Sequence, residues 1–297
     1  MRWKFVAALA AGIAVAALAS EGRAPAAEPS AAQIVERNVA ARGGLEAWRK
    51  VQTMVWLGHM SSVHAPTPTM LFVMQQQRPN KTRLEVNAMG ERTVRVFDGT
   101  RGWKAKPSRG GGGPDVRPFS FEEVTFARSV QAIDGPLIDY LAKGNTVTLE
   151  SLDEIEGHKA YRLAVRLATG EVDHVWIDAQ TFLDVRYDRP SSSAAGAANV
   201  SVFYRNYKKF EGLQIPSVIE TPAAPGVTPD KMVIENVLLN APVDERTFAQ
   251  PGTHERRRGM ATSGASQAPA RRAPVDPPAT PAASSPDPAS GPASGPN

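Results

Sequence analysis

The chain of 297 residues contains no cysteine. This absence excludes disulfides, thiolate metal sites, a cysteine nucleophile and an acylated N-terminal cysteine. Stability must therefore come from a hydrophobic core, and residues 27–248 are numerous enough to build one sizeable domain.

Catalytic motifs are also missing. The sequence has no G-x-S-x-G elbow and no H-E-x-x-H helix, and Pro114-Asp115 follows the four glycines at 110–113 where a phosphate loop needs Lys-Ser or Lys-Thr. His59 and His64 lie close together in the sequence, but no third metal ligand has a matching spacing. We therefore expect no enzyme activity, no metal and no cofactor.

Net charge is nearly absent from the domain itself. The whole chain carries +4, but segment 1–26 contributes about +2, and segment 249–297, with five arginines against three acids, contributes about another +2. A domain this close to neutral lacks the basic footprint of a nucleic-acid-binding protein.

The N-terminus has the pattern of an export signal. Arg2 and Lys4 precede an apolar run that is shorter than the roughly 20 residues of a membrane-spanning helix. Ala24-Pro25-Ala26 offers a cleavage site of the A-x-A form, and 17–19 is a rival site. We interpret 1–26 as a cleaved signal peptide of a soluble, unlipidated periplasmic protein; the alternative is an uncleaved anchor.

The C-terminal segment 249–297 is rich in Pro, Ala, Ser and Gly and has almost no large apolar residues. Such a composition cannot bury enough surface to offset the entropy of ordering, so we predict a disordered tail. It is either an inert extension or, through the arginines at 256–258 and 271–272, a segment that contacts anionic lipid headgroups.

The domain between these ends reads as strands with few helices. Residues 31–50 carry a rough apolar stripe and are expected to be helical, with Ser30 as the cap and an interruption at Gly43-Gly44. Residues 119–144 are expected to be helical in two segments broken near 134–136. Strand patterns separated by turn residues cover 51–61, 69–76, 82–88, 93–97, 102–105, 146–152, 160–167, 172–177, 183–187, 200–210, 213–220 and 231–239.

A meander of this length must curl. We predict an α+β, mainly β fold: a curved antiparallel sheet of about 11 strands, an incomplete β-barrel, with helices covering the concave face.

Several short motifs resemble those of one family. They are Arg78-Pro79-Asn80 at the start of a strand, Phe97-Asp98-Gly99 with Trp103 after it, 177–183, 212–216, and the closing Pro242-Val243-Asp244 with Phe248. In this order and spacing, over residues 30–248, the chain resembles the LolA/LolB-like superfamily, most closely the outer-membrane lipoprotein-sorting proteins.

The resemblance implies an apolar cavity that holds acyl chains of a lipoprotein or another lipid, taken from an inner-membrane donor complex and passed to an outer-membrane acceptor. It also implies that Arg78 is a latch, since the matching arginine of the carriers bonds to the helical lid; five donors in a fixed fork suit that role. The alternative is a solvated charge at a strand entry.

Large apolar residues on the strands are the candidates for the cavity wall, and ordinary core packing is the alternative for each of them. The candidates are Met54, Trp56, Met70, Phe72, Met74, Phe97, Trp103, Trp176 and Phe203. The sequence thus predicts a periplasmic lipid or lipoprotein carrier. Its rivals are a lipid-sensing or regulatory module of the same fold, and a structural envelope protein with a filled core.

Overall fold

The computed structural model describes residues 28–108, 113–129, 133–193, 196–222 and 227–251. All of them lie in one compact unit of the chain, Met1–His254. The predicted signal peptide, the predicted tail from residue 252 onward and residues 110–112 of the glycine run lie outside the described residues.

The described residues form three α-helices, one 3-10 helix and thirteen strands. The helices are α1 (Ala31–Ala41), α2 (Leu45–Lys50), α3 (Phe121–Ser129) and η1 (Glu245–Phe248). The strands are β1 (Thr53–Ser61), β2 (Met70–Gln77), β3 (Lys81–Ala88), β4 (Glu91–Phe97), β5 (Gly102–Lys106), β6 (Asp115–Pro118), β7 (Thr146–Ile155), β8 (His158–Arg166), β9 (Val172–Asp178), β10 (Asp184–Ser193), β11 (Gly196–Phe210), β12 (Leu213–Thr221) and β13 (Asp230–Leu239).

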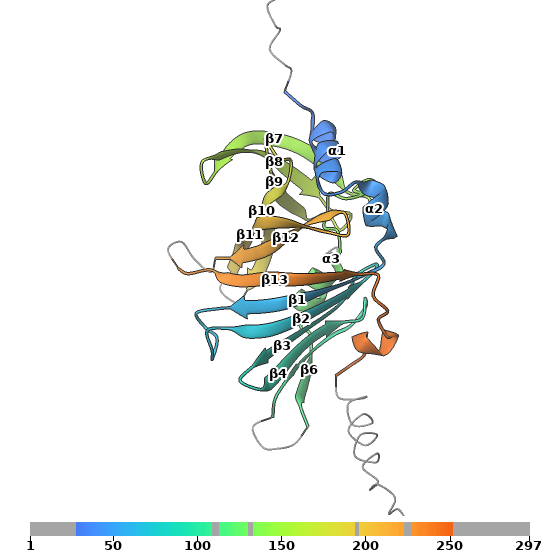
Figure 1. Ribbon diagram of the computed structural model, residues 1–297, viewed down its shortest axis with the longest axis vertical. Helices are drawn as coiled ribbons and strands as arrows, with labels where there is room; N and C mark the ends of the chain where they lie inside the picture. Colours follow the sequence, from blue (N-terminus) through green and yellow to red (C-terminus); the bar gives the residue numbers. More distant parts are fainter. Residues whose placement is uncertain (1–27, 109–112, 130–132, 194–195, 223–226, 252–297) are drawn as a thin grey trace, which may run out of the picture. The chain divides into compact units, whose positions relative to one another are not determined.

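All thirteen strands belong to one antiparallel sheet with the order β6-β5-β4-β3-β2-β1-β13-β12-β11-β10-β9-β8-β7 (Figure 1). Strands β1 to β6 and strands β7 to β13 each pair in sequence order, and the two series meet where β1 pairs with β13. Strands β6 and β7 remain as free edges, so the sheet is not closed into a barrel. The predicted mainly β, open antiparallel sheet is confirmed, with two strands more than the expected number of about 11.

Three local predictions were wrong. The sequence patterns assign no strand to 115–118, but β6 forms there; it pairs only at the sheet edge, where its Pro118 is tolerated. The β10–β11 hairpin runs on as far as the pair Ser193 and Gly196. Residues 133–144 form successive turns where we expected a second helix.

The N-terminal helices form as the sequence predicts. Ser30 caps α1 in a capping box with Gln33. The break between α1 and α2 needs glycine at Gly43, where φ is +115° and a Cβ atom would lie 2.7 Å from the carbonyl oxygen of Gly212. This close approach brings the helices against the turn between β11 and β12.

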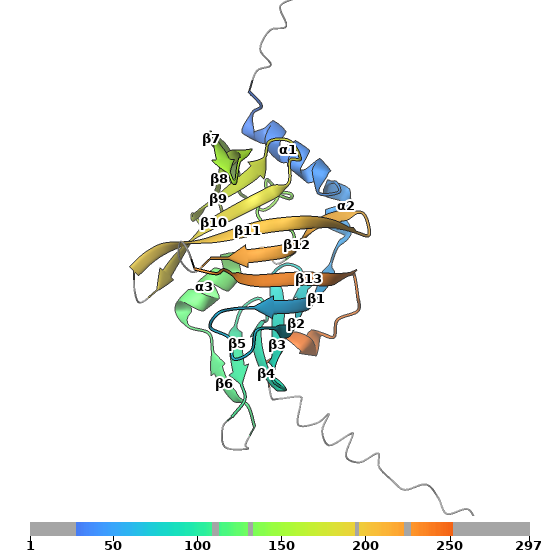
Figure 2. The same ribbon diagram turned by 60° about the vertical axis from the view of Figure 1, so that its left-hand side comes forward.

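Helices α1 and α2 and the 133–144 turns cover one face of the sheet, which we call the inner face (Figure 2). One buried cluster joins α2 and the 133–144 turns to the central strands: Trp48, Val51, Met54, Phe72, Ile133, Ile138, Leu213, Ile215, Ile234 and Val237. A second joins α1 to β8 and β9: Ile34, Val35, Leu137, Leu163, Val165, Leu167, Val175 and Ile177.

The opposite face, the outer face, is partly covered by the segment after β13. Phe248 at the end of η1 is buried, and the ammonium group of Lys81 lies 5.9 Å from the centre of its ring. Arg83 on β3 donates to the carbonyl oxygen of Thr247. Within the described ranges, no helix has the length and apolar character that crossing a membrane requires.

Candidate functional site

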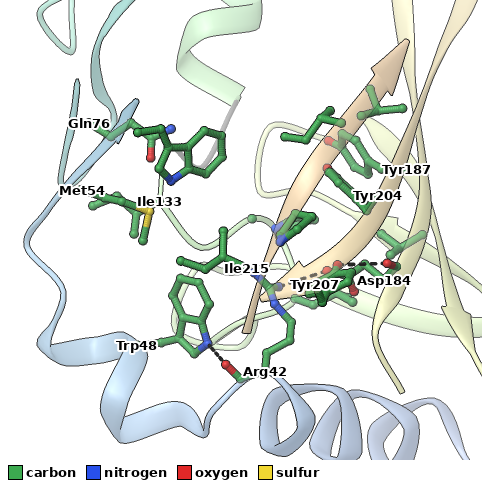
Figure 3. Close-up of a pocket in the computed structure, with 18 residues that line it drawn as sticks. Arg42, Trp48, Met54, Gln76, Ile133, Asp184, Tyr187, Tyr204, Tyr207 and Ile215 are labelled. Carbon is green, nitrogen blue, oxygen red and sulfur yellow. Dashed lines mark hydrogen bonds and ion pairs between the residues drawn. The ribbon is translucent and has the colours of Figure 1, made fainter. Parts of the chain in front are cut away.

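A pocket of about 260 Å³ lies between the inner face and its cover (Figure 3). Its walls come from α1, α2, the 133–144 turns and six strands, from β9 across the sheet to β2, so the sheet is concave here. The lining residues are Arg42, Trp48, Met54, Trp56, Gln76, Ile133, Gly135, Pro136, Leu137, Val175, Asp184, Tyr187, Val202, Tyr204, Tyr207, Ile215, Pro216 and Ile219. Most are apolar or aromatic, as in pockets that take small organic ligands.

The two sides of the pocket differ in character. Figure 3 shows Met54 and Gln76 on one side and Tyr187, Tyr204 and Tyr207 on the other. The apolar side suits hydrocarbon, whereas the tyrosine side combines apolar rings with polar tips.

Buried hydrogen bonds fix part of the tyrosine side. The Tyr207 hydroxyl donates to the carbonyl oxygen of Asp184 at 2.9 Å, and the Tyr187 hydroxyl donates to Asp173 at 2.5 Å. Burial raises the pKa of both tyrosines, and the Asp173 carboxylate raises that of Tyr187 further. The pKa of Asp173 is also raised by burial, against the effect of this hydrogen bond. Both hydroxyls are therefore protonated donors at neutral pH.

Arg42 enters the pocket from the C-terminal cap of α1. Its Nη1 lies 3.2 Å from a carboxylate oxygen of Asp184, and its guanidinium stacks over the Trp48 ring at 4.8 Å. Asp184 in turn accepts a hydrogen bond from Asn38 on α1. This chain of contacts fixes α1 and its cap against β10.

A second polar group lies beside α2, next to the residues that line the pocket. We call Arg78, Asp134 and Lys143 the latch cluster. Arg78 donates from Nε to the Val51 carbonyl at 2.7 Å and from Nη2 to the Trp48 carbonyl at 3.0 Å.

The latch cluster is completed from the 133–144 turns. Arg78 Nη2 also lies 2.6 Å from Asp134, whose carboxylate is 3% exposed and accepts from Lys143 at 2.6 Å. Burial lowers the pKa of Lys143, with Arg78 and Arg42 adding to the effect while Asp134 opposes it. One arginine from the loop between β2 and β3 thus holds both elements that cover the inner face.

The predicted wall residues of the first two strands share the inner face. Met54 and Trp56 line the pocket. Phe72 is buried in the central cluster, and Met74 packs against that cluster. Met70 is half-buried and lies on the same face by strand alternation.

Other predicted wall residues lie away from this pocket. Phe97 is buried and shares the inner face, through its pairing with Thr82, but does not line the pocket. Trp103 pairs with Val96, whose register with Arg83 places Trp103 on the outer face.

Trp176 and Phe203 also lie on the outer face, because their neighbours Val175 and Val202 occupy the inner one. There Arg186 stacks between them, 4.5 Å from the Trp176 ring and 5.5 Å from the Phe203 ring. Placing these two aromatics in the cavity wall was wrong, since arginine side chains cover the apolar outer positions of β9 and β11.

Sequence reasoning missed the polar and tyrosine part of the pocket. The alternation that places Val175 on the inner face also places Tyr187 there, because these two residues pair across β9 and β10. Gln76, a polar residue at the end of an apolar strand, was a further signal. No signal in the sequence pointed to Arg42, because an arginine after a helix is usually solvated.

The two histidines lie on and just after β1. His59 contacts Glu235 at 3.0 Å on the outer face of β1 and β13. The described part of the chain contains no group of three or more His, Asp or Glu side chains arranged for a metal ion.

No protein-family model matches the sequence, and no curated protein matches it. Solved structures do match. A DUF1329 family protein from Desulfovibrio piger is 12% identical with a TM-score of 0.50, over 74% of this chain and 97% of that one. A LolA superfamily protein from Nitrosomonas europaea, also 12% identical, has a TM-score of 0.49 over 75% of this chain and 99% of that one.

A third structure, described as an outer membrane lipoprotein-sorting protein domain, comes from Vibrio parahaemolyticus; it is 12% identical, with a TM-score of 0.47 over 72% of this chain and 94% of that one. At this identity the matches speak to the fold alone. Two of these structures carry the name of the superfamily that the sequence motifs of this chain resemble.

Proposed function

We propose that this chain is a periplasmic carrier that binds an acyl chain of a lipoprotein or another lipid in the inner-face pocket and moves it toward the outer membrane. The observation that carries the proposal is the pocket itself, with apolar and aromatic walls under a cover to which Arg78 bonds. Each methylene that enters such a pocket gains about 0.8 kcal/mol, so one chain supplies the affinity.

The latch cluster supports reversible loading. A carrier must open, and the contacts that resist opening here include the directional hydrogen bonds of Arg78 to Val51, Trp48 and Asp134, beside the apolar packing of the cover. Directional contacts of this kind are lost together when α2 and the 133–144 turns move away from the sheet. Such a two-state cover is what reversible sequestration needs.

The size of the pocket favours a single chain as cargo. Its volume of about 260 Å³ is below the roughly 300–1,000 Å³ of common ligand pockets. The same volume suits the second candidate function, a lipid-sensing or regulatory module of the same fold that binds one chain and transfers nothing.

A pocket-filling variant tests acyl binding. Ile219 lines the pocket on β12, so Ile219→Trp places an indole where the chain would lie. We expect at least a tenfold loss of affinity for a fluorescent acyl probe with little change in melting temperature. Leu71→Trp is the matched control, because Leu71 is 66% exposed on the outer face.

Transfer to acceptor vesicles then separates the two candidates. A carrier delivers bound acyl probe to the vesicles, whereas a sensor binds the probe and retains it. Equal probe affinity in Ile219→Trp and Leu71→Trp would contradict acyl binding in this pocket altogether.

A further inference from the structure

Three buried polar atoms of the pocket residues have no hydrogen-bond partner among the described residues. They are Arg42 Nε, Trp56 Nε1 and Gln76 Oε1. Buried polar groups in folded proteins are nearly always paired, and leaving one unpaired costs free energy. Three such atoms around one cavity therefore point to a ligand with polar atoms of its own.

Two of the three atoms are neighbours on the sheet. Trp56 pairs with Met74, and Gln76 pairs with Met54, so Trp56 and Gln76 are diagonal neighbours on the inner face. The indole nitrogen is only a donor. The Gln76 amide presents its oxygen here and can present its nitrogen after rotation, since its Nε2 otherwise contacts only the sulfur of Met74 at 3.2 Å.

The third atom enters from the helix side. Arg42 uses Nη1 for Asp184 at 3.2 Å and for the Asp134 carbonyl at 3.4 Å, and its Nε–H stays unpaired. Figure 3 shows Arg42 at the end of the pocket beside Trp48, with Gln76 across the cavity. The unpaired Nε–H of Arg42 and Nε1–H of Trp56 are both donors, which an acceptor-rich headgroup suits.

The charges around the cavity favour an anion. The side chains on this face pair as Arg42 with Asp184 and as Arg78 and Lys143 with Asp134. Arg189 and Asp173, which lie near Tyr187, add one charge of each sign. These groups are four cations and three carboxylates, so a bound anion would balance the set.

We propose that the pocket binds a single-chain amphiphile with a carboxylate headgroup, which accepts hydrogen bonds from Arg42 Nε and Trp56 Nε1, with the Gln76 amide as the third partner. This inference rests on the proposed acyl-binding function and names its ligand class. The carboxylate supplies two acceptor oxygens and the missing negative charge, and the chain lies along the apolar side near Met54.

The test compares two probes that differ only in the headgroup, decanoate and methyl decanoate, by isothermal titration calorimetry on the purified protein at pH 7.4. We expect the wild-type protein to bind decanoate at least tenfold more tightly. Trp56→Phe keeps the ring and removes the donor, so it should weaken decanoate binding roughly tenfold, since hydrogen bonds to charged groups are the stronger ones.

Trp176→Phe is the matched control, because it removes an indole donor on the outer face, where Nε1 donates to Asp153. It should leave both affinities unchanged. Equal wild-type affinity for the two probes would overturn the carboxylate headgroup while leaving acyl binding intact. Failure of both probes to bind would overturn the acyl-binding function itself.

A preference for decanoate that survives Trp56→Phe undiminished would overturn the assignment of Trp56. Arg42→Lys keeps the positive charge beside Asp184 and removes the Nε donor. It should reduce the preference for decanoate over its ester, and an unchanged preference would overturn the role of Arg42.

Discussion

Replacing Arg78 by methionine removes the one side chain that joins the loop between β2 and β3 to both covering elements. The variant loses the hydrogen bonds to the Val51 and Trp48 carbonyls and the ion pair with Asp134, which keeps only Lys143. Methionine keeps the length of the apolar stem, so the change isolates the guanidinium.

The magnitude follows from these contacts. The Val51 carbonyl loses a donor in a buried position, which costs about 1–3 kcal/mol, and one charge-assisted bond to Asp134 adds about 1.5–3 kcal/mol. The Arg78 side chain is 25% exposed, so solvent screens part of this, and we expect a total of about 3 kcal/mol. With a urea m-value near 3 kcal/mol/M, the unfolding midpoint should fall by about 1 M.

Hydrogen exchange shows where the loss occurs. The amides of Lys143, Gly144 and Asn145 donate to carbonyl oxygens within the 133–144 turns. If the latch cluster holds this cover, the exchange of these amides should be roughly 100-fold faster in Arg78→Met, as a loss of about 3 kcal/mol implies. Amides in β7 and β8, at one edge of the sheet, should exchange faster only by the amount that the loss of global stability causes.

Arg49→Met is the matched control. Arg49 also joins α2 to the 133–144 turns, through two hydrogen bonds to Asp139, but this pair lies at the surface. Exposed ion pairs contribute little, so exchange in the turns should change far less than in Arg78→Met. Equal effects of the two substitutions, or unchanged exchange in Arg78→Met, would refute the latch.

Three further predictions concern the elements around the pocket. Asn38→Leu removes hydrogen bonds to the Asp184 carboxylate and to the Phe182 carbonyl and should lower stability by about 2 kcal/mol in urea unfolding. An unchanged midpoint would show that α1 is held by packing alone. Gly43→Ala places a Cβ atom 2.7 Å from the Gly212 carbonyl at a φ of +115°, so thermal melting should occur several degrees lower, and a wild-type melting temperature would contradict this close approach. Although burial opposes it, hydrogen bonds from the Ser120 amide and from two cations lower the pKa of Glu123 from 4.5 to about 2. The stabilising contribution of Glu123 is therefore present above pH 4.5 and is lost as the pH falls toward 2. The stability difference between wild type and Glu123→Gln should shrink over that interval, and a constant difference would disprove this contribution.

The fold was predictable because its signals are local. Turn residues such as Asp98-Gly99 and Glu211-Gly212 separate strand patterns, and hairpins between consecutive strands leave few alternative topologies. The break at Gly43-Gly44 also reads directly from the sequence. The 133–144 segment misled because Leu137 and Ile138 have helical spacing to Leu141, but the first two are buried from turns and Leu141 is exposed.

The pocket was only half predictable. Met54 and Trp56 are apolar residues at alternating positions of one strand, and the structure brings them to the pocket. On β9 both faces are apolar, so alternation alone does not tell whether Val175 or Trp176 faces inward. The arginines that stack on Trp176 come from neighbouring strands, and these long-range contacts leave no pattern within the strand itself.

The most direct test of the acyl-binding claim is mass spectrometry of lipid extracted from the protein after purification from the bacterial envelope. The account predicts single-chain lipid in near-stoichiometric amount from the wild-type protein and from Leu71→Trp, with at least a tenfold reduction in Ile219→Trp. Protein that yields no acyl lipid above the level of a matched periplasmic control, or equal lipid from the two tryptophan variants, would contradict it.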